Sequence, residues 1–283
     1  MLSPCPAPVD VAVTRVATVD LSRIDADGYT CLDLLSDRQI AGLMDLIAEF
    51  GFSDRDGFFA SVAHAYGPSA QAFDREAKCL VEPTVAAAVP GYRLFLVSAT
   101  SKGYRDGAAL PFHHDWTYTD ERVHRTIFLW CPLVDTSVGN GTLQVIQGSH
   151  NWFTQIRPSR AAQPAEAFQS RLERLALPLE VRSGTAVAFD PALFHGSGPN
   201  RSGRSRPAVT FALVSDGAPL LHFHEDTDGG LQGAVVDDRF FTEHPYGSPP
   251  HRYETFAPWA NSVSHCDIDA VLRRVDRAGG APL

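Results

Sequence analysis

The chain has 283 residues, of which 44% are hydrophobic, so it can bury a large core as a single domain spanning residues 1–283. Its 24 basic and 33 acidic residues give a formal net charge of -9, and the basic residues form no long run. This balance argues against a nucleic-acid partner, because polyanions are bound by clustered lysine and arginine.

The N-terminal residues, the most apolar stretch and the cysteines together predict the cellular compartment. Residues 1–8 lack both a positive charge cluster and a sustained apolar run, which predicts no secretory signal. The most apolar stretch, 126–134, is far shorter than the ~20 residues that span a bilayer. The five cysteines are widely spaced without a Cys-x-x-Cys pair, which favours neither a disulfide framework nor a zinc cluster. We therefore expect a cytoplasmic protein without a membrane partner.

Helices and strands follow from turn residues and periodicity. A strand at 29–34 precedes Ser36 and Gln39, a capping-box pair, and apolar positions then recur at helical spacing until Gly51. A second helix is predicted at 165–176, and both helices should pack outside the sheet. Further strands are predicted at 92–98, 112–118, 126–134, 142–146, 179–181, 185–189 and 207–214.

Many short strands separated by Gly, Pro, Asn and Asp predict a mainly β fold with flanking helices, a cupin-like double-stranded β-helix or jelly roll. The C-terminal part is predicted to be a loop-rich extension. Residues 216–247 form a loop near the mouth of the site, with His222 and His224 facing substrate as one alternative, and 249–259 form a lid. Lys102, Tyr104 and Arg105 are predicted in a loop that closes over substrate.

The cluster His113-His114-Asp115 carries the strongest chemical signal. On a strand, His113 and Asp115 share one face and His114 points the other way. Adding the distant His195 gives two histidines and one carboxylate, a set that binds iron and leaves coordination positions open. Open positions favour catalysis over a structural metal.

Three segments around these residues occur in a characteristic order. They read LPFHHDW at 110–116, NGTLQVIQGSH at 140–150 and GTAVAFDPALFHGSGPN at 184–200, followed by Arg206. Together they resemble the phytanoyl-CoA dioxygenase family of iron(II)- and 2-oxoglutarate-dependent oxygenases. The resemblance extends from about residue 27 to about residue 214, with His114 where the family often has Gln.

The resemblance implies a role for each site residue. His113, Asp115 and His195 match the iron ligands. Arg206 matches the residue that binds the far carboxylate of 2-oxoglutarate, a task suited to a fork-shaped guanidinium, and Ser197 is placed to add a hydroxyl to that carboxylate.

Arg201 and Arg204 compete with Arg206 for this role. Strand periodicity does not separate the three, because Pro199, Asn200 and Gly203 interrupt any regular strand after His195. The spacing within the resembled family favours Arg206.

The activity implied by the resemblance uses iron(II), 2-oxoglutarate and O2 to hydroxylate an unactivated C–H bond of a small or medium metabolite, such as a natural-product intermediate. Succinate and CO2 are the coproducts. Halogenating relatives have a small residue in place of the carboxylate ligand, so Asp115 favours hydroxylation. The alternatives are a divalent-metal hydrolase, which has no use for Arg206 and Ser197, and a non-catalytic jelly-roll binding protein. The sequence encodes neither the substrate nor the oligomeric state.

Overall fold

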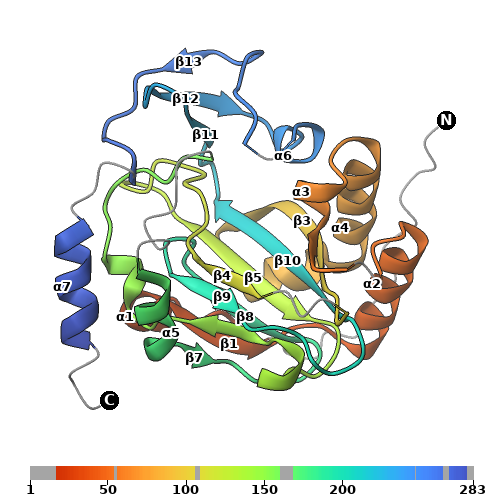
Figure 1. Ribbon diagram of the computed structural model, residues 1–283. Coiled ribbons are helices and arrows are strands. Elements are labelled where there is room, and N and C mark those ends of the chain that lie inside the picture. Colours follow the sequence, from red (N-terminus) through yellow and green to blue (C-terminus); the bar gives the residue numbers. More distant parts are fainter. Residues whose placement is uncertain are drawn as a thin grey trace.

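The computed structural model describes residues 17–53, 56–105, 109–159, 168–245, 247–263 and 268–278. These residues form mainly antiparallel β-sheet with flanking helices (Figure 1). The largest sheet has six strands, in the order β1 (Tyr29–Asp33), β8 (Thr185–Phe189), β5 (Thr126–Pro132), β10 (Arg206–Ser215), β3 (Tyr92–Lys102) and β2 (Phe58–Ala60). A second sheet has four strands, in the order β4 (Leu110–His113), β9 (His195–Ser197), β6 (Leu143–Val145) and β7 (Leu177–Pro178).

Two helices cover the outer face of the six-stranded sheet. The first is α2 (Asp37–Glu49), which begins with the predicted capping box between Ser36 and Gln39. The second is α4 (Pro68–Ala88), which the sequence analysis does not assign and which continues through Pro83. Their buried side chains pack on one face of the sheet, and Figure 1 shows the two helices on the same flank. The main buried side chains of this layer are Leu43, Ile47, Phe73, Val81, Val85, Val97, Ile127, Leu129, Val209 and Phe211.

Cross-strand register defines the inner face of the same sheet. Ala212 of β10 pairs with Leu96 of β3 on one side and with Phe128 of β5 on the other. Because directly opposed residues in an antiparallel sheet point to the same face, these side chains form a row. The row faces the four-stranded sheet, and the space between the two sheets holds the candidate site.

The C-terminal region differs from the prediction. The segment 216–247 contains a hairpin of β11 (Leu220–Glu225) and β12 (Leu231–Val236), so His222 and His224 lie on a strand. β13 (Thr255–Phe256) pairs with β12, so the segment predicted as a lid extends this third sheet instead. Turn residues misled the prediction because the hairpin connection is rich in Asp and Gly. In Figure 1 this sheet lies at one end of the molecule beside α6 (Phe240–Glu243).

Two other predictions need correction. The strand predicted at 112–118 ends at His113, and the strand predicted at 179–181 is found at β7. The helix predicted at 165–176 is α5 (Gln169–Leu175), while residues 165–167 lie outside the described residues. The remaining helices are α1 (Leu21–Asp27), α3 (Ser61–His64) and α7 (Ile268–Ala278), with short 3-10 turns at Val138–Asn140 and Ser149–Asn151.

Cysteine pairing also departs from expectation. Cys79 on α4 takes part in a disulfide, whereas Cys31 and Cys131 are free. In the described part of the chain, every helix is too short or too polar to cross a membrane.

The capping box of α2 gives a stability prediction. Replacing Ser36 with Ala removes the hydroxyl that accepts from the Gln39 backbone N–H, so we expect unfolding free energy to fall by about 1 kcal/mol. Ser36→Asp should retain most of the stability, because aspartate is an equally good N-cap. Urea unfolding of the three proteins measures this, and equal stabilities for Ser36→Ala and wild type would contradict it.

Candidate active site

The pairing of β4 with β9 brings two histidines together. His113 lies directly opposite His195 in the register, and their ring centroids are 4.3 Å apart. The carboxylate of Asp115 approaches the same point, with its Oδ2 3.6 Å from His195 Nε2. One ligand atom from each side chain lies within 4.8 Å of the others, a spacing that suits a single metal ion.

Backbone hydrogen bonds fix the tautomer of both histidines. The Nδ1 atoms of His113 and His195 each lie 2.9 Å from the carbonyl oxygen two residues earlier, on Pro111 and Leu193. A carbonyl only accepts, so Nδ1 carries the hydrogen and Nε2 keeps its lone pair for a metal. The pKa of each ring is lowered to about 4, mainly by burial, and for His113 the neighbouring His195 contributes to the decrease. Both rings are therefore neutral at pH 7, as a metal ligand requires.

Asp115 reaches the site from outside a strand. Because β4 ends at His113, the alternation of side chains on a strand does not place this carboxylate. Instead its backbone N–H donates to Pro191 O at 2.8 Å, and its carbonyl oxygen accepts from Arg157 Nε at 2.8 Å. Burial raises the pKa of Asp115 to about 6, while His113 and Arg157 oppose the rise. A bound cation would favour the ionised carboxylate.

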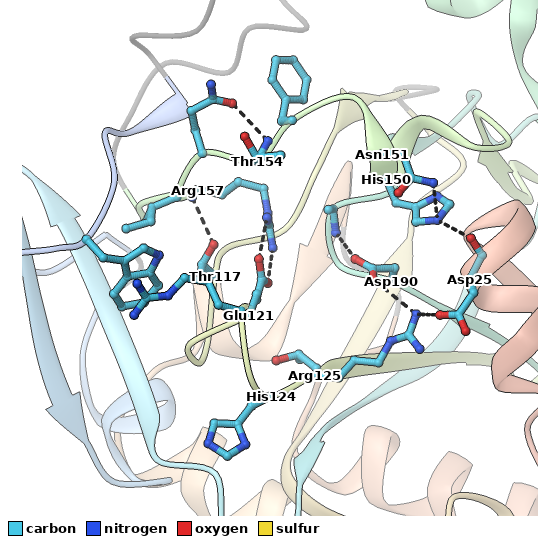
Figure 2. A pocket seen from close by; sticks show the side chains of 17 residues that line it. Asp25, Thr117, Glu121, His124, Arg125, His150, Asn151, Thr154, Arg157 and Asp190 are labelled. Atoms are coloured by element: carbon cyan, nitrogen blue, oxygen red, sulfur yellow. Dashed lines mark hydrogen bonds and ion pairs between the residues drawn. The ribbon is translucent and has the colours of Figure 1, made fainter.

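Arg157 holds the segment that follows His113 and Asp115 through several hydrogen bonds. Its side chain is 2% exposed, and its Nη1 donates to Glu121 at 3.0 Å. Its backbone exchanges hydrogen bonds with Thr117, donating to Oγ1 at 3.1 Å and accepting from the Thr117 N–H at 3.0 Å. Figure 2 shows Arg157, Thr117 and Glu121 in the wall of a second cavity of about 490 Å³. Asp115, whose carbonyl oxygen accepts from Arg157, lines a different cavity, so Arg157 connects the two.

His114 points away from the metal ligands, as expected. Its ring lies against Phe194 and Phe153, with centroids 5.1 and 5.8 Å away. Neither ring nitrogen has a hydrogen-bond partner among the described residues, and burial shifts its pKa well below the ordinary value. The ring is therefore a neutral core side chain.

A cavity of about 340 Å³ between the six-stranded and four-stranded sheets contains the three converging side chains. Arg206 and Ser197 line the same cavity. Tyr104, Arg105 and residues 249–259 are absent from its described lining, so the structure gives no support for these segments closing over substrate.

Arg206 is a buried cation on the wall of this cavity. It begins β10, is 2% exposed, and its guanidinium lies 5.1 Å from the centre of the Trp130 ring. Its Nε and Nη1 atoms have no hydrogen-bond partner in the part of the chain that the structure describes. Burial lowers its pKa to about 10, so it stays charged at neutral pH. An unpaired buried charge is costly, and an anion in the cavity would offset that cost. By contrast, Arg201 and Arg204 are exposed.

Lys102 is a further buried cation, and it lies on a strand instead of in the predicted loop. It is the last residue of β3, lies opposite Arg206 in the register and is fully buried, so it does not belong to a closing loop. Its Nζ donates to Ser197 Oγ at 2.6 Å, to Ser197 O at 3.2 Å and to Gly198 O at 2.6 Å. Because an ammonium group only donates, the Ser197 hydroxyl accepts from it and keeps its own hydrogen for another acceptor. No periodic signal near Lys102 marks this role.

Two neutral imidazoles and one carboxylate that converge in a partly apolar cavity are typical of non-haem iron oxygenases. The sequence matches the model of the Phytanoyl-CoA dioxygenase (PhyH) family over residues 45–208, more than half of the chain. The chain therefore belongs to the phytanoyl-CoA dioxygenase family, whose members are iron(II)- and 2-oxoglutarate-dependent oxygenases.

Curated relatives match a smaller part of the chain than the family model does. Phytanoyl-CoA dioxygenase domain-containing protein 1 of Rattus norvegicus is 33% identical over 116 residues, which are 38% of this chain and 40% of the relative. The same protein of Danio rerio is 29% identical over 116 residues, with the same coverage. The chain thus spans about two fifths of the length of these relatives.

Among solved structures, one with a TM-score above 0.5 shares the fold. The non-haem α-ketoglutarate-dependent carbocyclase SnoK from nogalamycin biosynthesis is 15% identical, with a TM-score of 0.52 over 77% of this chain and 88% of that one. EvdO2 from Micromonospora carbonacea var. aurantiaca, complexed with 2-oxoglutarate, is 18% identical, with a TM-score of 0.48 over 71% of this chain and 92% of that one.

The contacts of Arg157 predict a loss of metal affinity on substitution. We expect Arg157→Met to weaken binding of Co²⁺ by about 10- to 100-fold, because the Asp115 segment loses its guanidinium contact. Arg122→Met is the matched control, since Arg122 lines the same cavity but bonds to Asp120 instead. Metal titration, with thermal unfolding of both metal-free variants, measures the effect. Equal metal affinities in the two variants would contradict a positioning role.

Lys102 predicts a pH-dependent stability difference. Burial, and then Arg206, lower its pKa to about 7, below the value in the unfolded chain. The unfolded state therefore holds this proton between about pH 7 and pH 10 while the folded state releases it, so stability rises with pH in that window. We expect wild type to gain stability relative to Lys102→Met as pH rises from 7 to 10 in urea unfolding experiments. A constant difference would contradict the lowered pKa.

Proposed function

We propose that this protein is an iron(II)- and 2-oxoglutarate-dependent oxygenase that hydroxylates an unactivated C–H bond of a small or medium metabolite, such as a natural-product intermediate. Succinate and CO2 are the coproducts. The observation that carries the proposal is the buried guanidinium of Arg206, which lines the same cavity as the three metal-ligand candidates. Two of its nitrogens have no hydrogen-bond partner among the residues that the structure describes.

In this proposal His113, Asp115 and His195 hold the iron through two Nε2 atoms and a carboxylate oxygen. The donor set fits the metal, because both imidazoles are neutral and both Nδ1 atoms are already bonded to carbonyls. Bound iron supplies O2 activation coupled to oxidative decarboxylation of 2-oxoglutarate. The protein contributes fixed ligand directions and a cavity that excludes bulk water.

Arg206 and Ser197 are proposed to bind the far carboxylate of 2-oxoglutarate. The guanidinium offers two free donors, and the Ser197 hydroxyl offers a third because Lys102 occupies its acceptor side. Lys102 acts through Ser197 and, below its pKa of about 7, adds a second positive charge at that end of the cavity. Trp130 lies against the guanidinium and fixes its direction.

Further observations support this assignment over its alternatives. The two facing antiparallel sheets and the likeness to SnoK, an enzyme named as α-ketoglutarate-dependent, support a jelly-roll oxygenase. Asp115 supports hydroxylation over halogenation, because its carboxylate fills the position that a halide would take. The buried charge of Arg206 beside the metal-ligand candidates supports an oxo-acid cosubstrate, for which the chemistry of a metal hydrolase has no need.

The test is an anaerobic titration of the metal-free protein with iron(II) and then 2-oxoglutarate. Formation of the weak visible charge-transfer band of the chelated complex, and its loss in His195→Ala, would support the proposal. A folded protein that gives no band would overturn it.

Two substitutions separate the proposed roles. Asp115→Ala should abolish substrate oxidation while far-ultraviolet circular dichroism stays unchanged, because it removes one of three metal ligands. Arg206→Met should weaken 2-oxoglutarate binding by at least about tenfold and leave iron binding intact, because it removes the charge-assisted donors. Arg204→Met, at an exposed position, is the matched control. Wild-type affinity for 2-oxoglutarate in Arg206→Met would show that the cosubstrate assignment is wrong.

A further inference from the structure

We propose that the substrate presents an uncharged hydrocarbon scaffold containing rings to the metal, and carries neither a carboxylate nor phosphate groups near the reacting carbon. The inference rests on the proposed function and names the substrate class for that site. It follows from the chemistry of the cavity beyond the residues assigned to metal and cosubstrate.

The cavity has a polar end and an apolar end. Arg206 and Ser197 line the polar end, and Lys102 lies behind Ser197, to which its Nζ donates. Along the sheet, the row formed by Leu96, Ala212 and Phe128 lines the opposite end.

The metal-ligand candidates lie beside the apolar row. The ring of Phe189 is 4.8 Å from that of His195 and 5.9 Å from that of Phe128. Phe128 also pairs with Phe189 in the register of β5 and β8. A substrate held next to the metal therefore contacts aromatic and aliphatic side chains.

Charged groups are scarce in this lining. Among the described residues that line the cavity, Arg206 is the sole lysine or arginine and Asp115 the sole carboxylate. Both are assigned, one to the cosubstrate and one to the metal. A charged substrate group would then be buried without a counter-ion, which is strongly unfavourable. An uncharged group has no such cost.

The apolar end continues towards the C-terminal sheet. Val62, Leu96 and Tyr118 also line a small adjoining cavity of about 40 Å³. Its other walls include Phe240 and Phe241 of α6. Aromatic rings pack against each other here, with Tyr118 and Phe241 centroids 5.3 Å apart. Aromatic walls favour flat or cyclic ligands that offset-stack or meet a ring edge.

His222 adds no fixed charge to this end. Its Nε2 lies 2.9 Å from Ser248 O, so that nitrogen donates to the carbonyl, and the ring packs on Phe240 at 4.4 Å. The net charge of -9 also disfavours a substrate that carries several phosphates, such as a coenzyme A thioester. Binding such a group needs clustered cations, and the lining residues of the two adjoining cavities include only Arg206 in the described part of the chain.

The experiment uses the anaerobic iron(II)·2-oxoglutarate protein and three probes. They are 2-methylnaphthalene, naphthalene-2-sulfonate and decanoyl-coenzyme A, and the readout is the change in the visible charge-transfer band. We expect 2-methylnaphthalene to change the band saturably, with a half-saturating concentration at least about tenfold below that of the sulfonate. We expect the thioester to leave the band unchanged. Tighter or equal binding of either anionic probe would overturn the inference, as would no response to 2-methylnaphthalene.

Two variants connect this result to the apolar end. Val62→Trp and Ala63→Phe place bulk in the lining and should raise the half-saturating concentration of 2-methylnaphthalene at least about tenfold. The response to 2-oxoglutarate should stay unchanged. Val123→Trp, at a position that is 73% exposed, is the control. Unchanged probe binding in both cavity variants would also overturn the inference.

The two proposals fail differently. If the charge-transfer band does not form in wild type, the proposed function is wrong, and the inferred substrate class is wrong as well. If the band forms with the expected dependence on His195 but the probes behave otherwise, the oxygenase assignment stands and the substrate class alone is wrong.

Discussion

The pairing of β4 with β9 places His113 directly opposite His195, and the rest of the candidate site depends on that register. A shift of one residue would send the two rings to opposite faces of the sheet, since side chains alternate along a strand. The carbonyls of Pro111 and Leu193, two residues before each histidine, then orient both rings in the same way. A similar local geometry on two strands thus presents two matching nitrogen donors.

Burial between the sheets shifts the pKa values of the polar groups in the cavity and makes each of them depend on a partner. The buried site contains two neutral imidazoles, a carboxylate with a raised pKa, and two cations with lowered pKa values. Water would screen these groups at a surface, whereas in the interior each needs a partner. The polar end has more positive than negative charge, and this imbalance is what makes an anionic cosubstrate the natural complement. At the apolar end the same low polarity disfavours any charged ligand.

Much of the sheet was predictable from short apolar runs. The predicted strands at 29–34, 92–98, 126–134, 185–189 and 207–214 overlap observed strands closely, because buried strands carry continuous hydrophobic residues. The capping box predicted the start of α2 correctly. Helix α4 contains Pro83, a residue that usually ends helices, and was not assigned. The local composition predicts a loop at the β11–β12 hairpin, because turn residues dominate there.

The sequence by itself determined the identity and order of the metal-ligand candidates and the family, because ligand chemistry and motif spacing are local properties of the chain. Tertiary structure decided which of three arginines lines the cavity, how Arg157 holds Asp115 beyond the end of a strand, and that Lys102 bonds to Ser197. It also decided that the remaining described lining is mostly apolar and uncharged, with hydroxyl groups from Ser98, Thr100 and Thr210. Each of these depends on cross-strand register and on contacts between residues 40 or more positions apart, and local periodicity carries no information about such contacts.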